Sequence, residues 1–207
     1  MTVPRSEYRL DPAYYLPATT PVHSSRWIGI PDQSNLHELI DEFPGTEDDD
    51  ASLVTFTGAF SGDGSDTITF GFGFPLSYTE ISNGPRILGL LGIEMVVRMR
   101  GEFTSTEDVD IYWAFRRGSK FNNKAAAFVL HSGPFVPGGL PGPWAEYRQL
   151  FENDPITHKP WVMEDLAVTQ IGFSYTQQGN NPQFTSLCMI ANEEARVEGR
   201  TRQYRRR

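Results

Sequence analysis

The chain has 207 residues, of which 39% are hydrophobic and 13% aromatic, and its formal net charge is −8 at pH 7. This length favours one large domain, or one domain with extended arms. No stretch approaches the roughly 18 apolar residues of a membrane-spanning helix, and the N-terminal segment lacks the apolar core of a secretory signal, so we expect neither.

Residues 1–22 are predicted to form an extended arm. Four prolines prevent a regular helix in this segment, and its tyrosines are too apolar for a free linker. We expect the arm to be ordered only against a partner subunit, with Tyr14 and Tyr15 making the contact.

The domain proper spans residues 23–195 and begins with a segment that contains Trp27. Residues 34–40 predict a helix of one or two turns, with Ser34 as its cap. Residues 53–60 and 67–74 alternate as strands do, and the turn-rich sequence SGDGSD lies between them. We therefore expect these two strands to pair as a hairpin.

Further strands are indicated by apolar residues at every second position. The pattern is clear in residues 93–100 and 109–116, where Trp113 belongs to the inward-facing set. Strands are also predicted at residues 125–131, 144–152, 171–175 and 184–191. Eight to ten strands with regular turn signals predict an all-β protein, an antiparallel β-sandwich of jelly-roll type.

The segment NDPITHKPWVMEDLAVTQIGF, residues 153–173, is too long for a hairpin turn and predicts a crossover between two sheets. Pro155 and Pro160 fix its entry, and Trp161 is expected to cover the open edge between the sheets. Residues 163–167 form one helical turn that places Leu166 in the core, and Gly172 lets the next strand pass a bulky neighbour.

Residues 196–207 form a basic tail with six arginines and one glutamate, so they carry about +5 and the other residues about −13 (−8 − 5). A partner's acidic groove, a DNA backbone and solvent are all candidate surroundings for such a tail. We favour the acidic groove of a neighbouring subunit over DNA, because the acidic body repels DNA. The arginines assigned to this contact are Arg202, Arg205, Arg206 and Arg207.

Motifs of catalysis and cofactor binding are missing from the sequence, so we predict no catalytic residue, no cofactor and no metal site. The pair His131 and Ser132 lacks a local oxyanion hole. The acidic residues 47–50, with Asp63 and Asp66, lack the alternate spacing of a calcium loop. The single cysteine, Cys188, is expected to be a small buried apolar residue.

The four tryptophans raise the alternative of carbohydrate binding, because sugars stack on exposed aromatic faces. The alternation of apolar residues in its strand places Trp113 on the side that faces the core. Trp27, Trp144 and Trp161 lie at the edges of predicted elements. An edge tryptophan more often covers the core, with its N–H bonded to a backbone carbonyl. We therefore assign structural roles to Trp27, Trp113, Trp161, Pro155, Leu166 and Gly172.

Three stretches together carry a family resemblance: Trp27 followed by LIDEFPGTEDDD, then ILGLLGIEMVVRMRGEF, then the crossover with its final strand. Across residues 26–192 this layout resembles virion structural proteins of tailed double-stranded DNA bacteriophages, which look like jelly-roll or concanavalin-like sandwiches. The matching positions are Trp27, Asp41, Glu42, Arg98, Asn153, Pro155, Thr157, Trp161, Asp165, Leu166 and Gly172. The chain departs from the pattern at Val162, where the group usually has a Thr or Ser that caps the helix.

The resemblance implies a non-enzymatic subunit of a phage particle, assembled in the host cytoplasm and located on the capsid or in the tail. Its partners would be other virion proteins and further copies of itself, without a membrane and with DNA as a less favoured contact of the tail. The alternative is a carbohydrate-binding module or host-surface adhesin on the same fold, and a hydrolase is disfavoured by the missing motifs.

Overall fold

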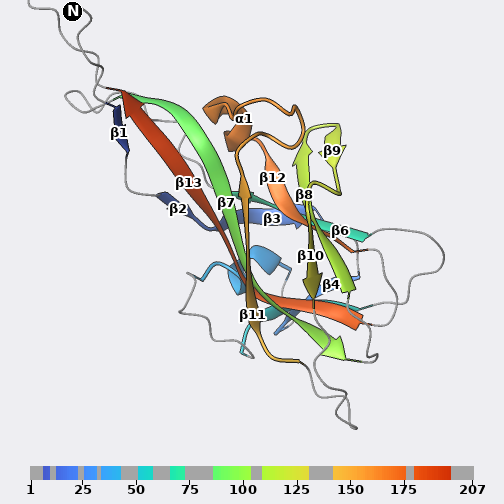
Figure 1. The fold of residues 1–207 in the computed structure, drawn as a ribbon. Coiled ribbons are helices and arrows are strands. Elements are labelled where there is room, and N and C mark those ends of the chain that lie inside the picture. Colours follow the sequence, from blue (N-terminus) through green and yellow to red (C-terminus); the bar gives the residue numbers. More distant parts are fainter. Residues whose placement is uncertain are drawn as a thin grey trace, which may run out of the picture.

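The computed structural model describes residues 7–9, 13–22, 26–31, 34–42, 51–57, 66–72, 86–103, 109–130, 142–175 and 180–196. These residues form two antiparallel sheets with very little helix (Figure 1). The prediction of an all-β sandwich is therefore confirmed.

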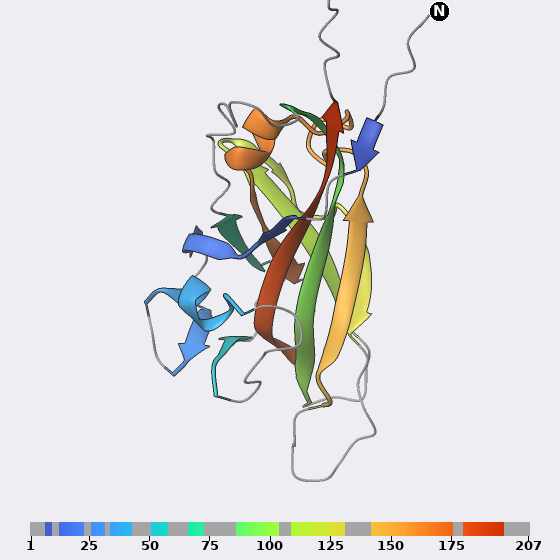
Figure 2. The ribbon, with the colours of Figure 1, turned by 90° about the vertical axis from the view of Figure 1, so that its left-hand side faces the viewer.

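The first sheet has the strand order β11-β7-β13-β5-β4, and two short strands, β1 and β2, also pair with β13. Strands β7 and β13 form its centre and run side by side over their whole length (Figures 1 and 2). The bounds are β1 Glu7–Arg9, β2 Ala13–Tyr15, β4 Trp27–Ile30, β5 Leu53–Phe56, β7 Arg86–Phe103, β11 Ala145–Phe151 and β13 Asn180–Arg196.

The second sheet has the order β10-β8-β12-β6-β3, and β9 pairs with the end of β8. Its central strands β8 and β12 turn Trp113, Phe115 and Phe173 toward the first sheet, which gives the core its aromatic character. The bounds are β3 Pro17–Val22, β6 Asp66–Phe72, β8 Val109–Arg117, β9 Lys120–Asn122, β10 Ala127–Leu130 and β12 Gln170–Tyr175.

The pairing of eight strands is nested. β8 pairs with β10, β7 with β11, β6 with β12 and β5 with β13, as in one long hairpin whose tip lies at β8 and β10. Two further pairings, β7 with β13 and β8 with β12, join this hairpin into the two sheets. The chain therefore crosses from one sheet to the other at most of its connections, including the one from β11 to β12.

Two expectations about pairing and length are wrong. The strands expected at residues 53–60 and 67–74 do not form a hairpin, because β5 pairs with β4 and β13 whereas β6 pairs with β12 and β3 in the other sheet. The strands expected at residues 93–100 and 184–191 are only the middle parts of β7 and β13, which have 18 and 17 residues. Figure 1 shows one end of this ribbon reaching beyond the sandwich, with β1 beside it.

The helical elements are short. The first is a 3₁₀ turn, η1 (Leu36–Leu39), which buries Leu36 and Leu39; Asn35 rather than the expected Ser34 precedes it, without a side-chain cap. The second, α1 (Met163–Ala167), has the predicted bounds and buries Leu166, although Val162 at its start cannot cap it. Among the described helices, none is long and apolar enough to cross a membrane.

The described part of residues 1–22 is paired within the chain. β1 and β2 extend the edge of β13, and β3 then crosses to the second sheet and pairs with β6. Tyr15 is buried in the main core, whereas Tyr14 is 53% exposed. The expectation that this segment is ordered only against a partner subunit is wrong for these strands, since β13 supplies the edge for β1 and β2, and β6 supplies the edge for β3.

Candidate functional site

The crossover from β11 to β12 contains a polar network that is largely buried. Asp154 begins a tight loop: its backbone N–H donates to the Lys159 carbonyl, and the His158 N–H donates to the Asp154 carbonyl. The Asp154 carboxylate accepts from the Ile156 N–H and the Thr157 hydroxyl, each at 2.9 Å. The loop closes with His158 at a φ of 58°. An aspartate whose carboxylate accepts a hydrogen bond from the backbone N–H two residues later stabilises a turn.

Arg117 at the end of β8 ties this loop to α1. Its guanidinium lies 2.9 Å from Asp154 and 2.9 Å from Asp165, and its Nε donates to the Thr169 hydroxyl. The Arg117 side chain is 12% exposed and that of Asp154 is 2% exposed, so these charges are largely removed from water. A buried charge requires such partners, and here the network joins β8, the loop and α1 into one unit.

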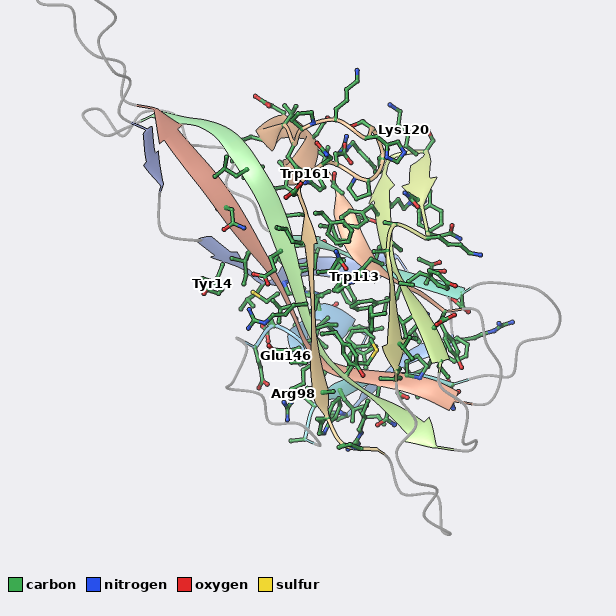
Figure 3. The ribbon with its side chains drawn as sticks, in the orientation of Figure 1. Tyr14, Arg98, Trp113, Lys120, Glu146 and Trp161 are labelled. Carbon is green, nitrogen blue, oxygen red and sulfur yellow. The ribbon has the colours of Figure 1, made fainter. Side chains whose placement is uncertain are left out.

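Trp161 lies between the two sheets directly after this loop. It is 4% exposed, its Nε1 donates to the Phe151 carbonyl at 2.9 Å, and its ring centroid is 6.1 Å from that of Phe115. Phe151 belongs to the first sheet and Phe115 to the second, so Trp161 joins the two layers (Figure 3). The structure thus places this side chain where it covers the core and leaves its ring inaccessible to a sugar.

The other tryptophans also lie within the protein. Trp27 packs edge-on against Phe56 at 5.2 Å, and Trp113 lies 4.8 Å from Phe173. Trp144 is half-buried beneath the Arg100 guanidinium, 4.3 Å from its ring centroid. The expected bond from an edge tryptophan N–H to a carbonyl forms at Trp161, whereas Nε1 of Trp27 and of Trp144 has no partner in the described part of the chain.

Gly172 and Pro155 occupy tightly packed positions. A Cβ atom on Gly172 would meet the backbone of β6, with the carbonyl carbon of Ile68 at 2.9 Å. The close neighbour of Gly172 is therefore the main chain of β6, whereas we expected a bulky side chain. Pro155 is buried, and its carbonyl accepts a hydrogen bond from the Asn122 side chain at 2.8 Å. Both positions serve packing of the crossover against the second sheet.

The remaining positions of the family resemblance are scattered over the first sheet and its margins. Asp41 is exposed and Glu42 half-buried just after η1, and Arg98 is half-buried on β7 opposite Glu146 of β11. Asn153 forms an isolated bridge with Pro160 at the base of the crossover loop. Of these residues, Asn153 directly precedes Asp154 of the Arg117 network. Arg98 lies toward the other end of the sandwich from Trp161 (Figure 3).

A hollow of about 450 Å³ opens beside the crossover loop. Its lining combines β11 residues with the loop and the segment after β9, and it includes Asn122, Phe151, Glu152, Asp154 and His158. Asn122 and Asp154 are already bonded to the loop itself. The other polar side chains of the lining are those of Glu152, Asn153 and His158, which are exposed. The shape of the hollow follows from the loop.

Described exposed aromatic side chains do not form a platform. The large aromatics among the exposed hydrophobic residues are Tyr14, on β2 of the first sheet, and Phe121, on β9 of the second sheet. In Figure 3, Tyr14 lies at the margin of the first sheet, away from Trp113 and Trp161. Sugar platforms need neighbouring coplanar rings, and these two residues belong to different sheets.

Cys188 belongs to a small apolar cluster on the outer side of the first sheet, with Val96, Ile190 and the partly buried Leu16. Burial raises the pKa of the Cys188 thiol to about 11. A reactive cysteine needs the opposite shift, because the thiolate is the nucleophile. The thiol is thus an apolar packing group at neutral pH.

Metal ligands do not gather within the part of the chain that the structure describes. Asp66 lies 3.6 Å from Arg26, with which it forms an ion pair. The acidic residues 47–50, Asp63, the pair His131 and Ser132, and the tail arginines 202 and 205–207 all lie outside the described residues.

Sequence patterns do not identify the pairing of Arg117 with Asp154, although the Asp-Pro pair at 154–155 is a known turn signal that indicates the loop. Comparison with known proteins adds no functional assignment: no family model matches the chain, and no curated protein or solved structure matches it significantly.

Proposed function

We propose that the chain is a jelly-roll structural subunit of a tailed-phage particle, without catalytic activity, which acts through contacts with other subunits. The nested pairing of β5 to β13 supports the jelly-roll topology, since a long hairpin rolled into two sheets gives this strand order. Viral capsid domains and lectins both use this architecture, so the fold alone does not select a function.

The main support for a non-enzymatic, structural role is that the polar side chains of the crossover form bonds within the crossover itself. Arg117 pairs with both Asp154 and Asp165. Asp154 lines the hollow beside the loop, but both of its carboxylate oxygens are bonded within the crossover. An enzyme or a sugar-binding site would instead leave such groups available to a ligand. The crossover is thus built for rigidity, which suits a subunit that must present the same surface in every copy.

Exposed apolar side chains do not add a ligand site. Leu91 and Leu150 on the first sheet, Val129 on the second, and Val162 and Val168 beside α1 are exposed. Apolar residues scattered singly over a surface are ordinary and select neither a ligand nor a neighbour. The virion location and other virion proteins as neighbours are what the family resemblance implies.

The test is genetic. We expect deletion of the coding sequence from its own genome to leave particles absent or incomplete in electron micrographs, and expression of the wild-type chain in trans to restore them. Normal particles without the chain would overturn the proposal. Binding of the purified chain to a glycan array, lost in Tyr14→Ala or Phe121→Ala, would replace it with the adhesin function.

A further inference from the structure

All the lysines of this chain lie at one end of the sandwich. There are three of them, Lys120, Lys124 and Lys159. Lys120 lies on β9 opposite Arg117, and Lys159 belongs to the loop that Arg117 binds through Asp154. Lys124 follows the end of β9 by two residues. The β8–β9 hairpin and the crossover loop therefore carry these three charges together.

Arg116 completes this group, because it lies opposite Phe121 in the pairing of β8 with β9. We call four exposed residues the basic end of the molecule: Arg116, Lys120, Lys124 and Lys159. None of the four forms an ion pair with another described residue. The Lys124 ammonium lies 5.4 Å from the centroid of the Tyr112 ring, which carries no formal charge.

Arginine side chains elsewhere in the described chain do interact with other residues, and these are Arg26, Arg98, Arg100, Arg117 and Arg148. Uncompensated positive charge among the described residues is thus concentrated at the basic end. The exposed Glu152 and Glu164 lie at this end too, and the Arg117 network adds −1, so the formal sum here is +1 (4 − 2 − 1).

Negative charge is concentrated in another part of the chain. Residues 27–85 contain eleven Asp and Glu and no Lys or Arg, so they carry −11, against +3 for all other residues (−8 + 11). Within this stretch, Glu38 in η1 and Asp41 just after it are exposed. Neither forms an ion pair with a described residue. We call Glu38 and Asp41 the acidic end.

The basic and acidic ends lie apart along the sandwich. In Figures 1 and 2, α1 lies at one end of the molecule, whereas η1 lies in the other half, beside β4 and β5. Figure 3 shows Lys120 at the same end as Trp161. The two sets of opposite charge do not meet within one copy, and both remain available to a second copy.

We propose that the basic end of one copy docks on the acidic end of the next, in a head-to-tail contact between copies of this chain. This inference rests on the proposed structural function and names one of its subunit contacts. A contact between two different surfaces repeats from copy to copy, and it gives a ring if the rotation closes and a filament if it does not. Charge sets the orientation, because contacts that bring two acidic stretches together are opposed by like-charge repulsion.

Nucleic acid is the other polyanion that a basic surface can bind. Its phosphates would approach a chain whose net charge is −8, and the basic end offers four cations beside the carboxylates of Glu152 and Glu164. A second copy instead presents its acidic end while its own basic end stays free for the next copy. We therefore assign the basic end to a second copy.

Exposed ion pairs are individually weak and are screened by salt. We therefore expect association of the isolated chain to need high protein concentration and low salt. Inside a particle other contacts hold the copies together, and the weak contact then becomes effectively intramolecular.

The experiment reverses the charge of each end in the full-length chain. One variant carries Lys120→Glu and Lys159→Glu, with a net charge of −12 (−8 − 4), and the other carries Glu38→Lys and Asp41→Lys, with a net charge of −4 (−8 + 4). In sedimentation equilibrium up to millimolar protein at low salt, we expect each variant alone to associate at least about tenfold more weakly than wild type. An equimolar mixture of the two should associate again, because each supplies the end that the other lacks.

The two variants control for each other. If net charge alone governed association, the −4 variant would associate more strongly than wild type, and mixing would give only intermediate behaviour. Circular dichroism and thermal midpoints establish that both variants are folded. In case one does not fold, wild type alone should associate at least about tenfold more weakly in about 500 mM than in about 50 mM NaCl.

A wild-type chain that stays monomeric at low salt, association that salt does not change, or a mixture no stronger than the separate variants overturns the inference. Binding of a short DNA duplex that K120E/K159E loses, without self-association of wild type, assigns the basic end to nucleic acid instead. If the mixture restores association but the chain is not part of any particle, the contact stands and the structural function fails. If the chain is a particle subunit but shows no association that charge reversal weakens, the contact alone fails.

Discussion

Trp161→Ala tests whether the crossover holds the two sheets together. The substitution removes a side chain that is 4% exposed and packs against Phe115, and truncation of such a tryptophan costs about 3–5 kcal/mol. It also leaves the Phe151 carbonyl without its donor, which contributes about 1–3 kcal/mol within that total. For a chain of this length, each kcal/mol lowers the melting temperature by about 2–4 °C, so we expect a decrease of about 6–20 °C.

Two further variants separate the causes in the same thermal and urea denaturation assay. Trp161→Phe keeps one aromatic ring and loses the hydrogen bond with a smaller part of the apolar packing, so it should cost less than Trp161→Ala, about 1–3 kcal/mol. Val162→Ala changes an exposed neighbour and should stay within about 0.5 kcal/mol of wild type. A folded W161A protein that melts within about 2 °C of wild type, about a third of the smallest decrease expected, would refute the reasoning.

Gly172→Ala should destabilise the fold by about 1–3 kcal/mol in urea titrations, because its Cβ would meet main chain at Ile68; a neutral effect would show that β12 can shift. Cys188 should resist maleimide at pH 7 in the native state and react on unfolding, and the stability from its raised pKa, full below pH 9, should be lost as pH rises toward 11; fast native labelling would contradict its burial. Tyr15→Ala should lower stability by about 3 kcal/mol or more while Tyr14→Ala leaves it unchanged; equal effects would mean that β2 is not docked as described.

Periodicity predicted the faces of the strands well and their partners poorly. The alternation around Trp113 identified β8 and its buried side, and the proline-flanked segment before Trp161 predicted both the crossover and the bounds of α1. Alternation does not say which strand lies alongside, and a turn-rich segment does not say whether the chain returns or crosses to the other layer. For this reason β5 and β6 were assigned to a hairpin that does not exist.

The remaining differences arise from contacts distant in sequence. The first part of β7 lacks regular alternation, so pairing with β13 extends it beyond the predicted strand. β1 and β2 are too short for a periodic signal, and their partner lies at the other end of the chain. Arg117 and Asp154 are 37 residues apart, and only the closing of the crossover against β8 brings their charges together.

The measurement that tests the central claim most directly is quantitative mass spectrometry of particles purified from the genome that encodes this chain. A structural subunit should be present at a fixed copy number that matches the symmetry of the capsid or tail and survives nuclease and high-salt washing. Absence of the chain from these particles, or a variable trace amount removed by washing, would contradict the account.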